Sequence, residues 1–116
     1  KEELTFDFTK KPSFYFGRRN NNDFARDDQH MSGTHAKITF SNGKFILEDR
    51  APPMGNFFYL SRTWLRLSEP YKESKGHKIE DGQFSKLGTQ LLTFAVLVHR
   101  KKKNQECNLK KIHIFV

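Results

Sequence analysis

Apolar residues in this chain recur at every second position over short runs, and this spacing limits the fold more than any other feature. Residues 4–8 alternate cleanly between apolar and polar side chains. Residues 35–40 do the same and would place Ala36, Ile38 and Phe40 on one face. No stretch keeps the three-to-four spacing of an amphipathic helix for long. The chain is therefore predicted to be all-β.

Turn signals separate these runs and predict how they connect. Asn42-Gly43 is the strongest hairpin signal in the chain. Residues 91–98 are apolar on both faces, which indicates a central strand, and residues 68–82 read as a polar connection. The spacing predicts a two-sheet β-sandwich of about ten to eleven mostly antiparallel strands. The remaining predicted strands cover residues 13–16, 24–26, 44–48, 56–60, 63–67, 84–87 and 110–116.

Length and charge bound the organisation and the partner. The 116 residues fit a single domain over 1–116, and the twelve Phe supply its core. The first residue is Lys1 rather than Met, so we expect a module of a larger protein. A formal charge of +8 favours an anionic partner. It does not choose among phosphate groups, acidic peptides, nucleic acid and a membrane surface.

The chain carries no targeting or membrane signal. The apolar run at residues 91–98 is far too short to span a bilayer, and the charged N-terminus does not resemble a signal peptide. A single cysteine, Cys107, cannot form an internal disulfide. We therefore expect an intracellular location, nuclear or cytoplasmic, and no membrane insertion.

The sequence offers no catalytic machinery. It has no Walker loop, no Gly-x-Gly-x-x-Gly, no His-Glu-x-x-His and no Cys-x-x-Cys. The five histidines lack the spacing of metal ligands, and Cys107 and His113 have no third group to orient them. We expect neither an enzyme nor a cofactor nor a metal site.

Two short motifs instead carry phosphate-binding chemistry. Gly17-Arg18 leaves one predicted strand, and Ser32-x-x-His35 enters the next. Arg18 and Ser32 lie fourteen positions apart in the sequence, which allows one short strand and two turns between them, so both loops can emerge at one end of a sheet. A guanidinium and a hydroxyl on neighbouring loops are two of the groups that best hold a phosphate.

The ordered set of motifs resembles the forkhead-associated (FHA) domain. Its pattern of Gly-Arg and Ser-x-x-His is followed here by Asp81-Gly82 and, with the family's spacing, by Gly88. The resemblance spans residues 14–98. It implies the FHA/SMAD-like β-sandwich and a module that recognises phosphothreonine in protein segments.

The resemblance also implies site residues. Arg18 and Ser32 would be the principal phosphate contacts, with the Gly33 amide supporting them. Arg19 is adjacent to Arg18 and would contribute mainly to the positive electrostatic potential around the site. His35, together with Gly17, would be a buried support of the binding loops rather than a catalytic base.

The chain departs from the family at the Asn-Gly loop, whose Asn bonds the ligand's main chain. One alignment places Met54 where the Asn belongs, and another starts the loop at Ser61-Arg62. The asparagine is missing under both, and Asn56 lies close enough to substitute for it. The region from Asn56 through Ser61 and Arg62 would read the peptide downstream of the phosphate.

Two alternatives stay open. The broken Asn-Gly loop is compatible with a degenerate scaffold that binds an unmodified protein through another sheet face. The basic residues 100–103, with 110–111 across a predicted hairpin, are compatible with nucleic-acid binding. The sequence does not indicate an oligomeric state.

Overall fold

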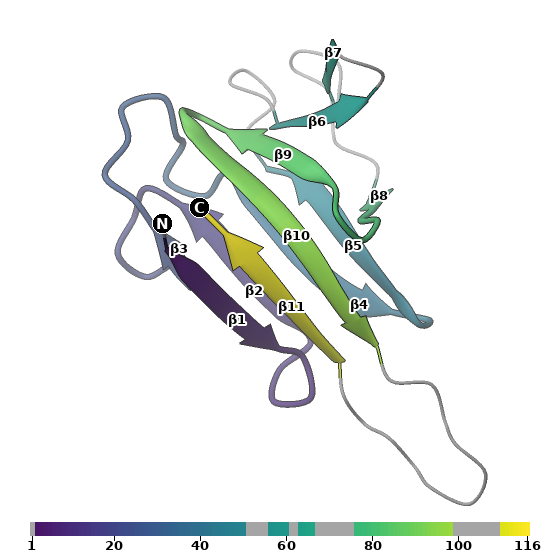
Figure 1. Ribbon diagram of the computed structural model, residues 1–116. Helices are drawn as coiled ribbons and strands as arrows, with labels where there is room; N and C mark the ends of the chain where they lie inside the picture. The colour runs from purple at the N-terminus through teal and green to yellow at the C-terminus, as the bar shows by residue number, and fades with distance from the viewer. Residues whose placement is uncertain (1, 51–55, 61–62, 67–75, 99–109) are drawn as a thin grey trace, which may run out of the picture.

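The computed structural model describes residues 2–50, 56–60, 63–66, 76–98 and 110–116 (Figure 1). Within these ranges the chain forms eleven strands and no helix. It therefore contains, over the same ranges, no helix that could cross a membrane. The strands are β1 (Glu3–Asp7), β2 (Ser13–Gly17), β3 (Phe24–Ala25), β4 (Ala36–Ser41), β5 (Lys44–Asp49), β6 (Asn56–Leu60), β7 (Thr63–Arg66), β8 (His77–Lys78), β9 (Phe84–Leu87), β10 (Gln90–Val98) and β11 (Lys110–Phe115).

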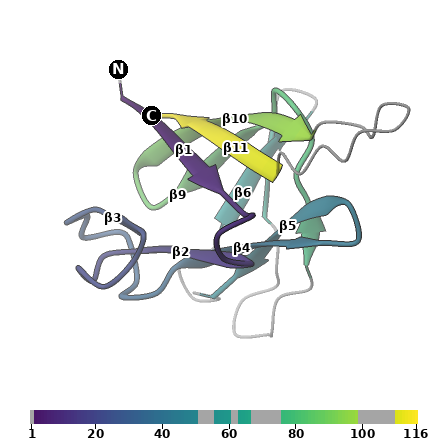
Figure 2. The same ribbon diagram turned by 90° about the horizontal axis from the view of Figure 1, so that it is seen from below.

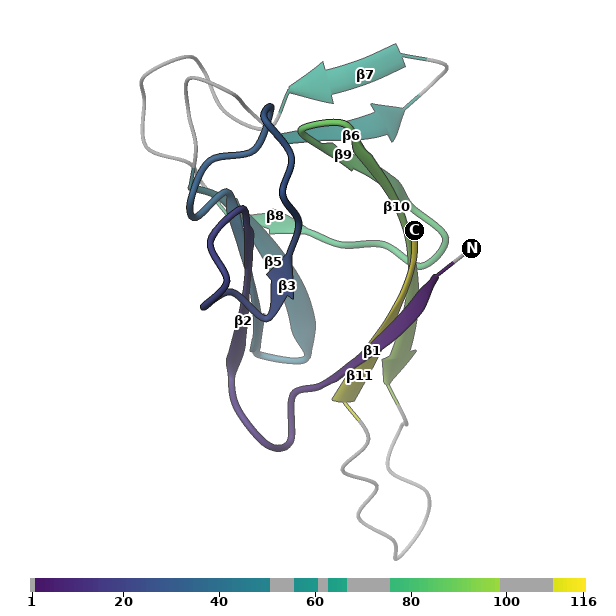
Figure 3. The same cartoon turned by 90° about the vertical axis from the view of Figure 1, so that its left-hand side faces the viewer.

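The strands form two sheets that face each other, as Figures 2 and 3 show. One sheet has six strands in the order β1-β11-β10-β9-β6-β7, and the other has five in the order β3-β2-β4-β5-β8. Neighbouring strands pair antiparallel, except that β2 and β3 run parallel. The predicted all-β sandwich is confirmed.

Phenylalanine rings fill much of the space between the sheets. Phe16 and Phe24 are almost fully buried, and their ring centroids lie 5.4 Å apart. Phe6 packs on Phe16 at 5.5 Å, and Phe8 packs on Phe45 at 5.0 Å. Tilted and edge-on aromatic pairs of this kind stabilise a core beyond their buried area. The many Phe residues thus give a chain of low mean hydropathy a dense core.

The β4–β5 hairpin shows why the sequence pattern was informative. Asn42 and Gly43 have φ of 52° and 77°, the left-handed values that a two-residue hairpin turn requires. Ala36 and Ile38 are buried, and Phe40 packs against the core. The predicted hairpin and its core face are both confirmed.

Two predictions about strand positions meet different outcomes. The run at residues 91–98 lies in β10, between β11 and β9, so its central place is confirmed. Its outward face is less covered than predicted, because Leu91 is exposed. The polar connection predicted over residues 68–82 is wrong in part, since β8 lies within it and pairs with β5. Two residues are too short to show an alternating pattern.

Candidate functional site

The Gly-Arg loop and the Ser-x-x-His loop lie side by side, as their spacing predicts. The Arg18 amide donates to the Ser32 carbonyl at 2.8 Å, and the Arg19 amide donates to the Gly33 carbonyl at 3.3 Å. Close to the start of β4, the His35 amide donates to the Phe16 carbonyl at 2.7 Å. These bonds join the segment that leaves β2 to the segment that enters β4.

Gly17 and Asn22 hold the two loops at close range. A Cβ atom at position 17 would lie 2.4 Å from the Gly33 carbonyl oxygen, so only glycine fits there. The Asn22 side-chain amide donates to the carbonyls of Arg19 and Gly33, at 2.8 and 2.7 Å. Asn22 is the last of three consecutive asparagines, a residue type that commonly bonds nearby backbone groups in turns.

His35 supports the second loop from inside. Its ring is fully buried, and Nδ1 accepts a hydrogen bond from the Ser32 amide at 3.1 Å. The neutral ring therefore carries its hydrogen on Nε2. The His35 carbonyl accepts from the Arg50 amide, at the end of β5, at 2.9 Å. This histidine links three segments of the backbone and does not reach solvent.

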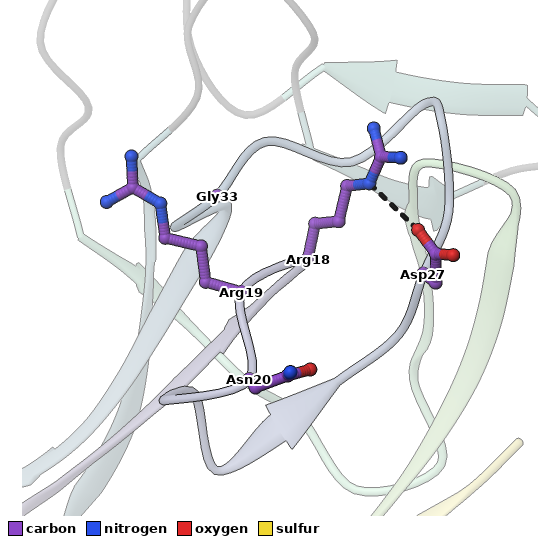
Figure 4. Close-up of a pocket in the computed structure, with 5 residues that line it drawn as sticks. All are labelled: Arg18, Arg19, Asn20, Asp27 and Gly33. Atoms are coloured by element: carbon purple, nitrogen blue, oxygen red, sulfur yellow. Dashed lines mark hydrogen bonds and ion pairs between the residues drawn. The ribbon is translucent and has the colours of Figure 1, made fainter.

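An open pocket of ≈ 530 Å³ lies over these loops, lined by Arg18, Arg19, Asn20, Asp27 and Gly33 (Figure 4). We call it the arginine pocket. Three of the residues expected to bind the ligand line it, Arg18, Arg19 and Gly33. Ser32 is not among the lining residues: it is half-buried, and its amide and carbonyl form hydrogen bonds with His35 and Arg18.

Asp27 is a pocket residue that the sequence did not indicate. Its Oδ1 accepts a hydrogen bond from Arg18 Nε at 3.0 Å, and the two form an ion pair. Because β3 runs parallel to β2, residues that follow β3 emerge at the same end as Arg18. The parallel pairing of β3 with β2 is a property of the fold, and no local pattern in the sequence indicates it.

The next residue, Asp28, joins the same loop to the other sheet. Its carboxylate is buried and accepts from the Thr89 amide at 2.9 Å, the Thr89 hydroxyl at 2.5 Å and the Gln90 side chain at 3.2 Å. It also accepts from the His30 amide at 2.8 Å. Burial raises the pKa of Asp28, but these hydrogen bonds outweigh it and hold the pKa below the ordinary value. We call this set the Asp28 junction.

The Asp-Gly to Gly motif ends at this junction. Gly88 has φ +60°, and a Cβ there would lie 2.6 Å from Met31 Cγ and 3.0 Å from Asp28 Oδ2. The β9–β10 turn can therefore approach the β3–β4 loop closely only with glycine at this position. Asp81 accepts from the Val96 amide at 2.9 Å and fixes the other end of the motif. Both ends of the motif are thus structural.

The remaining sequence candidates fall at or beyond the edge of the described structure. Asn56 begins β6 and pairs with Leu87, beside the Asp28 junction. Ser61, Arg62 and Cys107 lie outside the described residues. Over the described part of the chain, no three His, Cys, Asp or Glu residues gather as they would around a metal ion.

Comparison with known proteins agrees with this architecture. No curated protein sequence matches the chain. The fold resembles the FHA-2 domain of the Mycobacterium tuberculosis ABC transporter Rv1747, with a TM-score of 0.56 and 21% identity over 80% of this chain and 78% of that one. It also resembles M. tuberculosis EmbR, solved in complex with a low affinity phosphopeptide, with a TM-score of 0.61 and 17% identity. That match covers 86% of this chain but only 26% of EmbR.

The family model of the FHA domain matches residues 14–84, which include both loops of the arginine pocket and the start of the Asp-Gly motif. FHA domains are interaction modules. This match covers more than half of the sequence, and the chain belongs to the FHA domain family.

Proposed function

We propose that the chain is a phosphopeptide-binding module that recognises phosphothreonine in a partner protein. Arg18 binds the phosphate with its guanidinium, the Gly33 amide donates to a phosphate oxygen, and Ser32 adds its hydroxyl. The module would thereby make an association between proteins depend on phosphorylation, inside the cell.

The arginine pocket is the observation that carries this proposal. Two guanidinium groups and a glycine backbone line one open hollow, on loops held together by hydrogen bonds of 2.8 and 3.3 Å. A phosphate carries about two negative charges and three acceptor oxygens at neutral pH, and a guanidinium is the donor that matches it best. A neutral peptide would offer neither guanidinium an anionic group to bind.

Ser32 has a fixed backbone and a hydroxyl that is not engaged by the described residues. Its backbone is fixed to Arg18 and His35 on either side, whereas its side chain is only half-buried. No described residue forms a hydrogen bond with its hydroxyl. The hydroxyl can therefore reorient by rotation about the Cα–Cβ bond while the backbone stays in place.

Membership of the FHA family supports the proposal of phosphothreonine, rather than any phosphorylated residue, as the ligand. EmbR, which shares the fold, was solved with a phosphopeptide. The pocket's two arginines do not by themselves separate threonine from serine. The test must therefore compare both residues in the same peptide.

Fluorescence anisotropy with a labelled phosphothreonine peptide library tests the proposal. We expect binding that disappears when the peptides are dephosphorylated and that falls at least tenfold in Arg18→Ala, because a charge-assisted hydrogen bond is worth about 1.5–3 kcal/mol. Phosphoserine peptides should bind more weakly. Equal binding by wild type and Arg18→Ala would overturn the proposal.

Lys44→Ala is the matched control for charge. Lys44 is exposed at the β4–β5 turn, at the opposite end of the sheet from the arginine pocket. Like Arg18→Ala, the Lys44→Ala substitution removes one positive charge, but it should leave peptide affinity unchanged. Binding to nucleic acid would behave differently, since it would fall steeply with salt and ignore peptide phosphorylation.

A further inference from the structure

Arg19 is held in a defined place beside the arginine pocket. Its amide donates to the Gly33 carbonyl at 3.3 Å, and its own carbonyl accepts from the Asn22 amide at 3.1 Å and the Asn22 side chain at 2.8 Å. The backbone from which this side chain rises is therefore tied to both loops.

Gly33 gives the Arg19 side chain the room that it occupies. A Cβ atom at position 33 would lie 2.7 Å from Arg19 Nε, 3.1 Å from Cδ and 3.2 Å from Cγ. Three consecutive atoms of Arg19 thus lie over the bare Cα of Gly33. Any larger residue at position 33 would displace them, so this glycine places the second guanidinium as well as offering its amide.

The two guanidinium groups of the pocket differ in their partners. Arg18 is paired with Asp27, whereas no carboxylate among the described residues pairs with Arg19. Figure 4 shows the two side chains diverging from consecutive residues, with Asp27 beside Arg18 alone. One cation of the pocket thus has a described protein anion within reach, and the other is an exposed side chain without one.

From this asymmetry we propose that Arg19 is a specificity-determining residue that binds a second anionic group on the ligand. The inference rests on the proposed function, in which the phosphate binds at Arg18. The ligand would then be a phosphorylated segment with an acidic side chain close to the phosphorylated residue. Two side chains that diverge from adjacent residues suit anions within about three residues of each other, because an extended peptide spans about 3.3 Å per residue.

A peptide scan tests this directly. One phosphothreonine peptide with alanine at the three positions on either side is compared with variants that carry a single glutamate at each position. We expect glutamate at one or two positions to improve the affinity of the wild type about two- to fivefold, within the range for an exposed ion pair. A further peptide carries a second phosphothreonine at the position where glutamate helps most. Comparing its affinity with that of the glutamate peptide shows whether Arg19 prefers a phosphate or a carboxylate.

The decisive quantity is the ratio of affinities for the glutamate and alanine peptides. Arg19→Gln should bring it to about one, whereas Lys44→Gln, the matched charge control, should leave it unchanged. Gly33→Ala should also lower the ratio, because it keeps the charge of Arg19 but displaces its side chain. A thermal melt of each variant establishes that it is folded.

Failure of this inference and failure of the proposed function are distinguishable. If the alanine peptide binds but no glutamate improves binding, or if the improvement survives Arg19→Gln, Arg19 is not a specificity residue. If no phosphopeptide binds the wild type, the proposed function is overturned together with this inference.

Discussion

Two adjacent aspartates, Asp27 and Asp28, lie in opposite environments. The Asp27 side chain is 90% exposed and pairs with Arg18 in the arginine pocket. Asp28 is 8% exposed and accepts hydrogen bonds that join the two sheets. The Asp27 carboxylate is thus a partner of Arg18 that a ligand can replace. The Asp28 carboxylate, one residue later, is a buried structural group.

The difference shows how one loop can serve binding and stability together. A phosphate must displace or share the partner of Arg18, so that partner has to be weakly held. Exposed ion pairs contribute about 0–1 kcal/mol, which meets this need. The loop that carries the pocket must nevertheless keep its conformation. The buried Asp28 holds that conformation through hydrogen bonds to the opposite sheet.

Asp28→Asn should have the largest effect, and it acts on stability. The asparagine amide keeps the shape of the side chain but loses its negative charge. Its NH₂ group also points at groups that donate to the Asp28 carboxylate, so those donors lose their acceptor. Hydrogen bonds to a charged group are worth about 1.5–3 kcal/mol, so we expect a loss of about 2–3 kcal/mol and a Tm lower by about 10 °C. Asp27→Asn should change the unfolding free energy by less than about 0.5 kcal/mol. Calorimetry measures both unfolding free energies. Similar losses of stability in the two variants would contradict the proposed difference between Asp27 and Asp28.

Acid should weaken the Asp28 junction selectively. Because the pKa of folded Asp28 lies below its ordinary value, the unfolded state takes up the proton at higher pH, and stability rises with pH. The contribution should be complete at neutral pH and decline below about pH 4, the ordinary range for aspartate. The Tm difference between wild type and Asp28→Asn should therefore narrow as the pH falls. A difference that stays constant down to pH 2.5 would contradict the assignment.

Thr89→Val measures one arm of the junction. It removes the hydroxyl that donates to Asp28 at 2.5 Å and leaves the Thr89 amide in place. We expect a loss of about 1.5 kcal/mol in urea unfolding, with an unchanged slope. Thr89→Ser keeps the donor and should lose much less. A serine variant as unstable as the valine variant would mean that the methyl group, not the hydroxyl, matters.

The smallest effect should come from Asp27→Asn, and it should act on binding. Freeing Arg18 and removing a negative charge from the pocket should raise phosphopeptide affinity about two- to fivefold, the scale of an exposed ion pair. Isothermal titration at low ionic strength measures the change, which salt should reduce. Glu80→Gln removes the same charge from the exposed Lys78 pair and should have no effect. Weaker binding in Asp27→Asn would mean that Asp27 positions Arg18 rather than competing for it.

Much of the fold could be predicted from local patterns. Alternation places Ala36 and Ile38 in the core, and Asn42-Gly43 specifies the hairpin because few other residues adopt both positive φ values. The two-residue strand β8 escaped prediction because it is too short to have a period. Its pairing with β5 depends on tertiary contact alone.

The candidate site divides in the same way. The motifs around Arg18 and Gly33 could be found because their spacing is local and characteristic. Asn22, Asp27 and Thr89 could not, because each acts on a residue that folding brings near it. An asparagine in a turn and an aspartate after a short strand have many possible partners, and the sequence does not say which are chosen.

The order of short alternating runs and turn residues was enough to specify a β-sandwich and the two loops that meet at one end of it, since strand period and turn chemistry are properties of neighbouring residues. Only the tertiary structure decided which aspartate faces Arg18 and which one is buried, and which arginine lies over Gly33. Those outcomes depend on the parallel course of β3 beside β2 and on the close approach of the β9–β10 turn to the β3–β4 loop. Contacts between segments far apart in the chain set them, and no local pattern encodes such contacts.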